Sequence, residues 1–117
     1  MQLKSIMLLL NATLLCGDDL LETEVRSAFA SDLMSDVLAL VKDQTVLLTG
    51  LCNPQVLRTA EMLDIICVIM VRGKQPDQYI IQMANEKNIC LLSTKKTMFN
   101  SCGLMFTSGI NGGLINE

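Results

Sequence analysis

The chain has no histidine and no tryptophan, and aromatic residues make up only 3% of its 117 positions. Without histidine, imidazole metal ligands and histidine general bases are excluded. Charged residues are also few, at 18%, and the formal net charge is −3. Domains that bind nucleic acid carry a basic excess, so this balance argues against nucleic acid as a partner.

No apolar run reaches the 18 or more residues that a membrane-spanning helix needs. The first sixteen residues, MQLKSIMLLLNATLLC, resemble a short signal peptide that ends in a lipid-modified cysteine. Against that alternative, Leu15 stands where such a signal has a small residue. Apolar residues follow the i, i+3, i+4, i+7 spacing of a helix instead: Leu3, Ile6, Met7 and Leu10. We therefore expect a cytoplasmic protein without a membrane partner.

The cysteines number five, and no two are spaced as C-x₂-C. Structural zinc and iron–sulfur sites contain such close pairs, so we expect no metal and no cofactor. Three cysteines lie in apolar runs, which is typical of buried free thiols in a reducing compartment: Cys16, Cys67 and Cys90. Cys52 precedes a predicted helix and is the single candidate for a thiol nucleophile.

Half of the residues are hydrophobic, and eight of these are methionine. A chain of this length is one domain with a single modest core. An apolar excess in so short a chain indicates that part of the surface is an interface. We expect a homodimer, the commonest symmetric assembly.

Short apolar segments alternate with helical patterns along the chain. Strands are predicted over residues 12–16, 24–30, 45–49, 66–71 and 89–92. We expect Ser31 or Asp32 to cap a helix, Asn53 to cap the next with Pro54 at its first position, Pro76 to open a third, and Thr94 to cap a last helix that ends at Gly103. Residues 107–117 are glycine-rich, and we expect a loose tail. This order predicts a single three-layer-type α/β domain over residues 1–117, with a mainly parallel sheet and flanking helices.

Ligands of open parallel sheets collect beyond the carboxyl ends of the strands. Four of the nine basic residues follow predicted strands, and predicted helices also begin there, with free N–H groups. The pattern favours a site for a small anion, although turns are commonly polar for solvation alone. The candidate ligand-binding residues are Gly50, Asn53, Arg72, Gly73, Lys74, Thr94 and Lys95. No catalytic motif accompanies them, so we expect no enzyme activity.

The stretch from Thr45 through residue 106 resembles the DRTGG domain family in the order of its elements. A strand ends near Gly50, a helix follows around Arg58-Thr59-Ala60, an apolar strand ends at Gly73, and Ser93-Thr94 follow the last strand. The upstream segment SDLMSDVL fits stand-alone members of this family. Leu51-Cys52-Asn53 and Arg72-Gly73-Lys74 stand where the family has its namesake Asp-Arg and Thr-Gly-Gly.

The resemblance implies a regulatory or dimerisation module. Such domains accompany nucleotide-sensing, phosphotransacetylase and pyrophosphatase domains, and they are similar to the N-terminal domain of HPr kinase/phosphorylase. Our first hypothesis is a non-catalytic regulatory module that senses a small anion such as a nucleotide. The alternatives are a structural adaptor for a redox complex (hydrogenase-associated) or a kinase complex, and an iron–sulfur or thiol enzyme.

Overall fold

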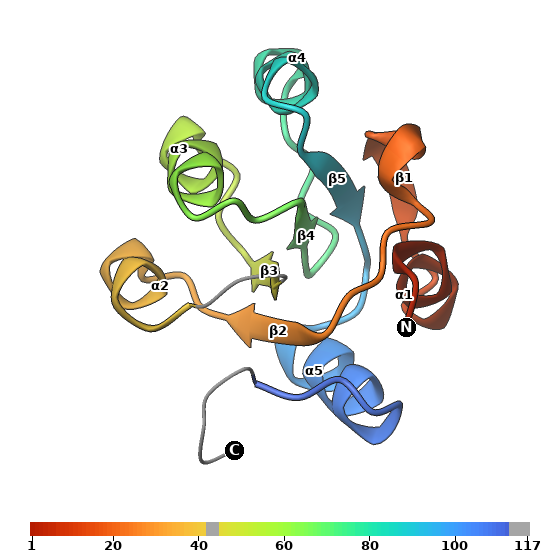
Figure 1. Ribbon diagram of the computed structural model, residues 1–117. Helices are drawn as coiled ribbons and strands as arrows, with labels where there is room; N and C mark the ends of the chain where they lie inside the picture. The colour runs from red at the N-terminus through yellow and green to blue at the C-terminus, as the bar shows by residue number, and fades with distance from the viewer. Residues whose placement is uncertain (42–44, 113–117) are drawn as a thin grey trace.

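The computed structural model describes residues 1–41 and 45–112 and consists of one α/β domain (Figure 1). Its helices and strands follow one another in the order α1 (Leu3–Leu9), β1 (Thr13–Cys16), a short 3₁₀ turn η1 (Asp18–Leu20), β2 (Ser27–Ala30), α2 (Met34–Leu40), β3 (Thr45–Thr49), α3 (Pro54–Met62), β4 (Cys67–Met70), α4 (Gln78–Glu86), β5 (Cys90–Ser93) and α5 (Met98–Thr107).

The strands of the described residues form one sheet in the order β1-β5-β4-β3-β2. Strands β2 to β5 are parallel, as predicted, and adjacent strands in the sheet are consecutive in the chain. Strand β1 pairs antiparallel with β5, with Leu14 opposite Leu92. The first strand therefore completes the sheet at the edge beside the last one.

Helices cover both faces of this sheet, which confirms the three-layer architecture (Figure 1). Helices α2, α3 and α4 pack on one face against Leu47, Val68 and Leu91. Helices α1 and α5 pack on the other face against alternate strand residues such as Leu48 and Ile69. The strands are apolar on both faces because each face is buried under helices.

Helix starts follow the predicted capping chemistry in part. Asn53 caps α3, since its side chain accepts a hydrogen bond from the Val56 N–H at 3.2 Å. The prediction that Ser31 or Asp32 caps α2 is wrong, because Leu33 holds the N-cap position without a side-chain bond. Helix α4 begins at Gln78 behind the cap Asp77, two residues beyond Pro76.

The last helix differs most from its prediction. Thr97, not Thr94, caps α5, and its hydroxyl accepts from the Asn100 N–H at 3.2 Å. Gly103 does not end the helix but lies within it, four residues before its last residue. Glycine is common just past the end of a helix, which is why the sequence favours an end at Gly103. Here the helix continues for another turn, and this turn buries Met105 in the core.

The prediction of a loose tail over residues 107–117 holds only in part, because some of these residues pack against the domain. Ile110 is buried, and the Ala28 N–H donates to the Asn111 carbonyl at 2.9 Å. This contact places Asn111 beside the outer edge of β2, where an unpaired strand would otherwise be exposed. The rest of the predicted tail, residues 113–117, lies outside the described residues. Within the described residues, no helix has the length and apolar character required to cross a bilayer.

Candidate functional site

The parallel arrangement of β2 to β5 brings the loops that follow these strands to one edge of the sheet. All the sequence-predicted site residues lie in these loops or at the helix start that follows: Gly50 and Asn53 after β3, Arg72, Gly73 and Lys74 after β4, and Thr94 and Lys95 after β5. Because β1 is antiparallel, the turn that enters it reaches the same edge.

The loops after β4 and β5 leave this edge in opposite directions. The loop after β4 leads to α4 on one face of the sheet, and the loop after β5 leads to α5 on the other. A crevice between two such diverging loops is where open α/β sheets bind ligands. From the connectivity we therefore expect a ligand site at the carboxyl ends of β4 and β5.

A pocket of about 320 Å³ lies at this position. It is lined by Leu10, Asn11, Ala12, Thr13, Gln75, Ser93, Thr94, Lys95 and Lys96. Its lining includes two lysines and two side-chain amides but no carboxylate. Neither lysine has an ion-pair partner among the described residues. The pocket thus combines uncompensated positive charge with neutral hydrogen-bonding groups.

The hydrogen bonds of Thr94 join the segments that line this pocket, so its hydroxyl is not free to donate to a ligand. Its buried hydroxyl donates to the Leu10 carbonyl at 2.7 Å and accepts from the Lys96 N–H at 3.3 Å. Its own N–H donates to the Met70 carbonyl, and its carbonyl accepts from the Gly73 N–H. These bonds tie the loops before β1 and after β4 to the end of β5.

The loop after β4 has an unusual backbone. Arg72 has a φ of 63° and Gly73 a φ of 69°, both in the left-handed region. For a non-glycine residue this conformation costs on the order of 1 kcal/mol. The N–H of Arg72 donates to the Lys96 carbonyl at 2.8 Å, and the N–H of Gly73 donates to Thr94. The two loops are thereby joined across the crevice, and neither N–H is left for a ligand.

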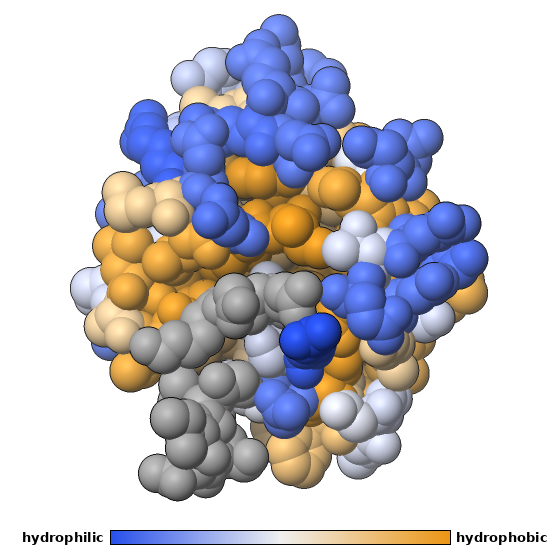
Figure 2. Space-filling view, in the orientation of Figure 1, coloured by the Kyte–Doolittle hydropathy of each residue, from blue (hydrophilic) through white to orange (hydrophobic). Residues whose placement is uncertain are grey.

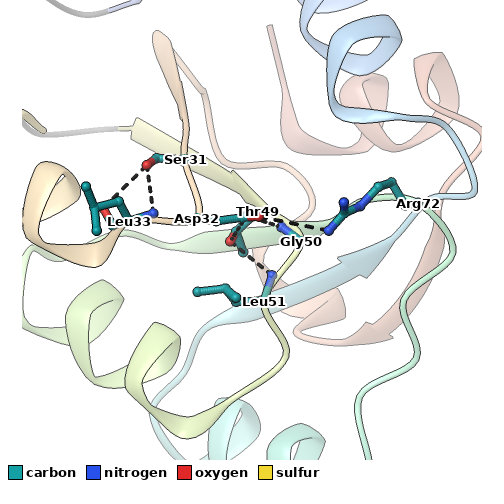
Figure 3. Close-up of polar contacts among 7 residues, drawn as sticks. All are labelled: Ser31, Asp32, Leu33, Thr49, Gly50, Leu51 and Arg72. Carbon is teal, nitrogen blue, oxygen red and sulfur yellow. Dashed lines mark hydrogen bonds and ion pairs between the residues drawn. The ribbon is translucent and has the colours of Figure 1, made fainter.

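A second polar group lies beside β3, centred on Asp32 (Figure 3). The Asp32 carboxylate accepts from the Gly50 N–H at 2.6 Å and from the Thr49 hydroxyl at 3.0 Å. Its other oxygen is 3.9 Å from the Arg72 guanidinium. A side chain on Gly50 would collide with that guanidinium. Arg72 is therefore held over β3 and does not line the pocket, so the predicted residues separate into two groups.

Lys74 and Asn53 also lie outside the pocket lining. Lys74 is exposed, and its carbonyl accepts from the Ser93 hydroxyl at 2.9 Å. The side-chain oxygen of Asn53 accepts the capping bond from Val56. Of the predicted residues, Thr94 and Lys95 line the pocket, whereas the others lie outside its lining.

Five polar residues of the pocket were not among the predicted ligand-binding residues: Asn11, Thr13, Gln75, Ser93 and Lys96. Lys96 follows Lys95 in the sequence and Gln75 follows Lys74, so position alone would have found both. Asn11 enters the pocket because β1 lies antiparallel beside β5. No local pattern in the sequence reveals that pairing.

Among the described residues, no accessible thiol has a lowered pKa: a hydrogen bond with Cys67 lowers the pKa of the Cys90 thiol, but Cys90 is fully buried. Burial raises the pKa of the Cys52 thiol, and nearby Lys74 offsets this only in part. Cys52 packs on the face of the sheet covered by α3, and Cys102 packs on the opposite face. Cys67 and Cys90 are fully buried, as predicted, whereas Cys16, predicted with them, is only partly buried. Among the described residues, no three histidine, cysteine or acidic side chains gather into a group that could hold a metal ion.

Two of three comparisons with known proteins find a match. The family model of the DRTGG domain matches residues 5–107. A crystal structure of the CBS and DRTGG domains from the regulatory region of Clostridium perfringens pyrophosphatase, complexed with the activator diadenosine tetraphosphate, has a similar fold with a TM-score of 0.74. The two chains are 16% identical, and the match covers 92% of this chain and 46% of the other. No curated protein matches this chain significantly.

Proposed function

Because this chain belongs to the DRTGG domain family, we propose that it is a non-catalytic regulatory domain that binds a small phosphate-bearing anion, such as a nucleotide. The proposed site is the pocket beyond the carboxyl ends of β4 and β5. The observation that supports it most directly is the pair Lys95 and Lys96, two lysines without acidic partners among the described residues, at one polar pocket.

The residues of the pocket suit this ligand class. Lysine ammonium groups attract phosphate as point charges. The amides of Asn11 and Gln75 are exposed and can donate to phosphate, ribose or base atoms. The volume of about 320 Å³ is at the small end of ligand pockets. This size suits a mononucleotide or a smaller phosphorylated metabolite.

The similar structure supports the regulatory role and the chemical class of the ligand. That protein is the regulatory region of a pyrophosphatase, and its activator is a dinucleotide with four phosphates. This chain spans about half of that region, which also contains CBS domains. The binding residues are therefore proposed from the pocket in this chain and not from the neighbour's ligand.

A thermal-shift screen tests the proposal with inorganic phosphate, AMP, ATP and diadenosine tetraphosphate as probes. A ligand at 100 times its Kd stabilises the folded state by about 2.7 kcal/mol. For a domain of this size, that energy raises Tm by about 10 °C. Gln substitution of both Lys95 and Lys96 is expected to abolish the shift.

The matched control removes two positive charges elsewhere, through Lys4→Gln and Arg58→Gln. Both side chains are exposed and lie outside the pocket, so the shift should persist in this variant. A shift that is equally weakened in both double variants would reflect general electrostatics and contradict the site. A flat screen with all four probes would favour the alternative function, a structural adaptor.

A further inference from the structure

An open groove along helix α5 adjoins the candidate anion pocket. It has a volume of about 490 Å³ and is lined by Lys96, Phe99, Asn100, Gly103, Leu104 and Thr107. Lys96 also lines the anion pocket, so the two hollows meet at this residue. In Figure 2, hydrophilic residues gather over the ends of α3 and α4 and beside α1, whereas the lower rim, where α5 lies, is mostly white and pale orange. The groove therefore extends the charged pocket along a helix that has no charged side chain.

Phe99 gives this groove an exposed aromatic ring. The side chain is 84% accessible, although it lies only three residues after Lys96. An exposed ring has a flat face on which another ring can stack, and nucleobases use aromatic side chains in this way. A phosphate-binding lysine and a stacking surface thus lie side by side along the groove.

Gly103 leaves the helix backbone bare beside this ring. It follows Phe99 at i+4, a spacing that makes two residues neighbours on a helix surface, and both line the groove. A side chain at Gly103 would meet no atom within 4 Å, so packing inside the domain gives no reason for the glycine. Glycine within a helix is less stable than alanine, but it lets another group approach the backbone closely. The position therefore has room for a flat group beside the ring.

Asn100 adds hydrogen-bonding capacity to the same groove. It is exposed, and within residues 1–41 and 45–112 its side-chain amide forms no hydrogen bond, although its backbone N–H donates to the Thr97 hydroxyl. An amide offers both donors and an acceptor, the combination that pairs with the edge of a base such as adenine. No carboxylate lines the groove to repel a phosphorylated ligand.

We propose that this groove, which we call the α5 groove, is a nucleobase subsite next to the anion pocket. The phosphate of the ligand binds at Lys95 and Lys96, the base stacks on Phe99 beside the bare backbone of Gly103, and the Asn100 amide pairs with the base edge. The subsite rests on the proposed anion site and narrows its ligand from small phosphorylated compounds in general to nucleotides.

The continuity at Lys96 favours a base over an alkyl chain as the occupant. Phe99 and Gly103 also line a second, apolar pocket of about 360 Å³, which includes Phe106 but neither lysine. An alkyl chain is buried best in that apolar pocket. A phosphate at Lys96 adjoins the α5 groove directly, because this lysine lines the groove and not the apolar pocket.

Isothermal titration calorimetry with AMP and ribose 5-phosphate tests the subsite, since both probes carry the ribose and the phosphate and only AMP carries a base. We expect AMP to bind the wild-type protein about 10-fold more tightly, the gain typical of one stacked base. Phe99→Leu removes the ring but keeps an apolar side chain, so most of this advantage should disappear while the Kd of ribose 5-phosphate stays unchanged. Phe106→Leu is the matched control, because Phe106 is an exposed phenylalanine of the same helix that does not line the groove, and the advantage should persist.

A second variant fills the groove without removing the ring. Gly103→Gln places a neutral side chain in open space, so the domain should fold with an equal or higher Tm. The same side chain occupies the place of the base, and we expect the Kd of AMP to rise about 10-fold, to that of ribose 5-phosphate.

The outcomes separate the subsite from the anion site. Equal Kd values of AMP and ribose 5-phosphate for the wild-type protein would overturn the base subsite and leave the anion site in place. An advantage of AMP that survives both Phe99→Leu and Gly103→Gln would also overturn the subsite. If neither probe binds, the anion site and the base subsite are both wrong. Octyl phosphate serves as a third probe: tighter binding than AMP that is lost in Phe106→Leu would assign the contact to the apolar pocket and overturn the proposal.

Discussion

Removal of the Asp32 carboxylate should destabilise the domain more than its exposed position suggests. Its oxygen accepts a 2.6 Å hydrogen bond from the Gly50 N–H, which is buried, and a 3.0 Å bond from the Thr49 hydroxyl. Asp32→Ala leaves that N–H without its partner, at a cost of about 1–3 kcal/mol. The ion pair with Arg72 adds little, because both side chains are about half exposed at 3.9 Å. We expect a total loss of about 2 kcal/mol.

Urea denaturation measures this loss directly. With an m-value of about 1–3 kcal/mol/M for a small domain, the midpoint should fall by roughly 1 M. Asp32→Asn retains a carbonyl oxygen as acceptor, and its loss should be about half as large. Asp36→Ala is the matched control, since Asp36 is exposed on α2 and only its interaction with the helix dipole, about 0.3–1 kcal/mol, is removed. If Asp32→Ala is no more destabilising than Asp36→Ala, the short bond to Gly50 does not hold the loop.

Three further predictions concern the neighbouring loops and thiols. Gly50→Ala should destabilise the wild-type protein by at most about 1 kcal/mol, because the new methyl group displaces only the end of the half-exposed Arg72 side chain. The loss should be smaller in an Arg72→Ala background, and equal losses in a double-mutant cycle would refute the contact. Thr94→Val removes the buried hydroxyl that donates to the Leu10 carbonyl, and the free energy of unfolding measured in urea should fall by about 1–3 kcal/mol. An unchanged free energy of unfolding would show that this bond does not join the loops. Burial raises the pKa of the Cys52 thiol, so less of it is thiolate at pH 8 than in a free cysteine. Mass spectrometry should therefore show that iodoacetamide alkylates Cys52 more slowly than it alkylates glutathione. Faster alkylation of Cys52 would contradict the burial argument.

The parallel half of the fold was predictable because its signals are local. Strand β3 was predicted with its observed bounds, Thr45–Thr49. The Asn53-Pro54 pair marks the start of α3 by capping chemistry that involves only neighbouring residues. Short apolar strands separated by amphipathic helices have few arrangements other than a parallel sheet. The carboxyl edge, and with it the position of the candidate site, follows from that arrangement.

The details of the site depend on contacts between distant residues, which local patterns do not reveal. Asp32 has the sequence context of a helix cap, but its carboxylate accepts a hydrogen bond from the N–H of Gly50, which is 18 residues away in the sequence. Thr94 and Thr97 flank two lysines and are equally good caps by type, and only the bond from Thr94 to Leu10, 84 residues away, decides between them. The pairing of β1 with β5 is equally distant in sequence.

The position of β1 has a consequence for the order in which the domain forms during translation. Strands β2 to β5 each pair with the next strand along the chain, so they can assemble as the ribosome extends it. Strand β1 precedes the other strands in the sequence, but its partner strand is β5, Cys90–Ser93. It therefore has no strand to pair with until most of these residues have been synthesised. Until β5 has joined the sheet, the apolar side of α1 has only part of the sheet face against which it packs. The amino-terminal hairpin of helix and strand is thus the segment that nascent-chain chaperones would meet longest.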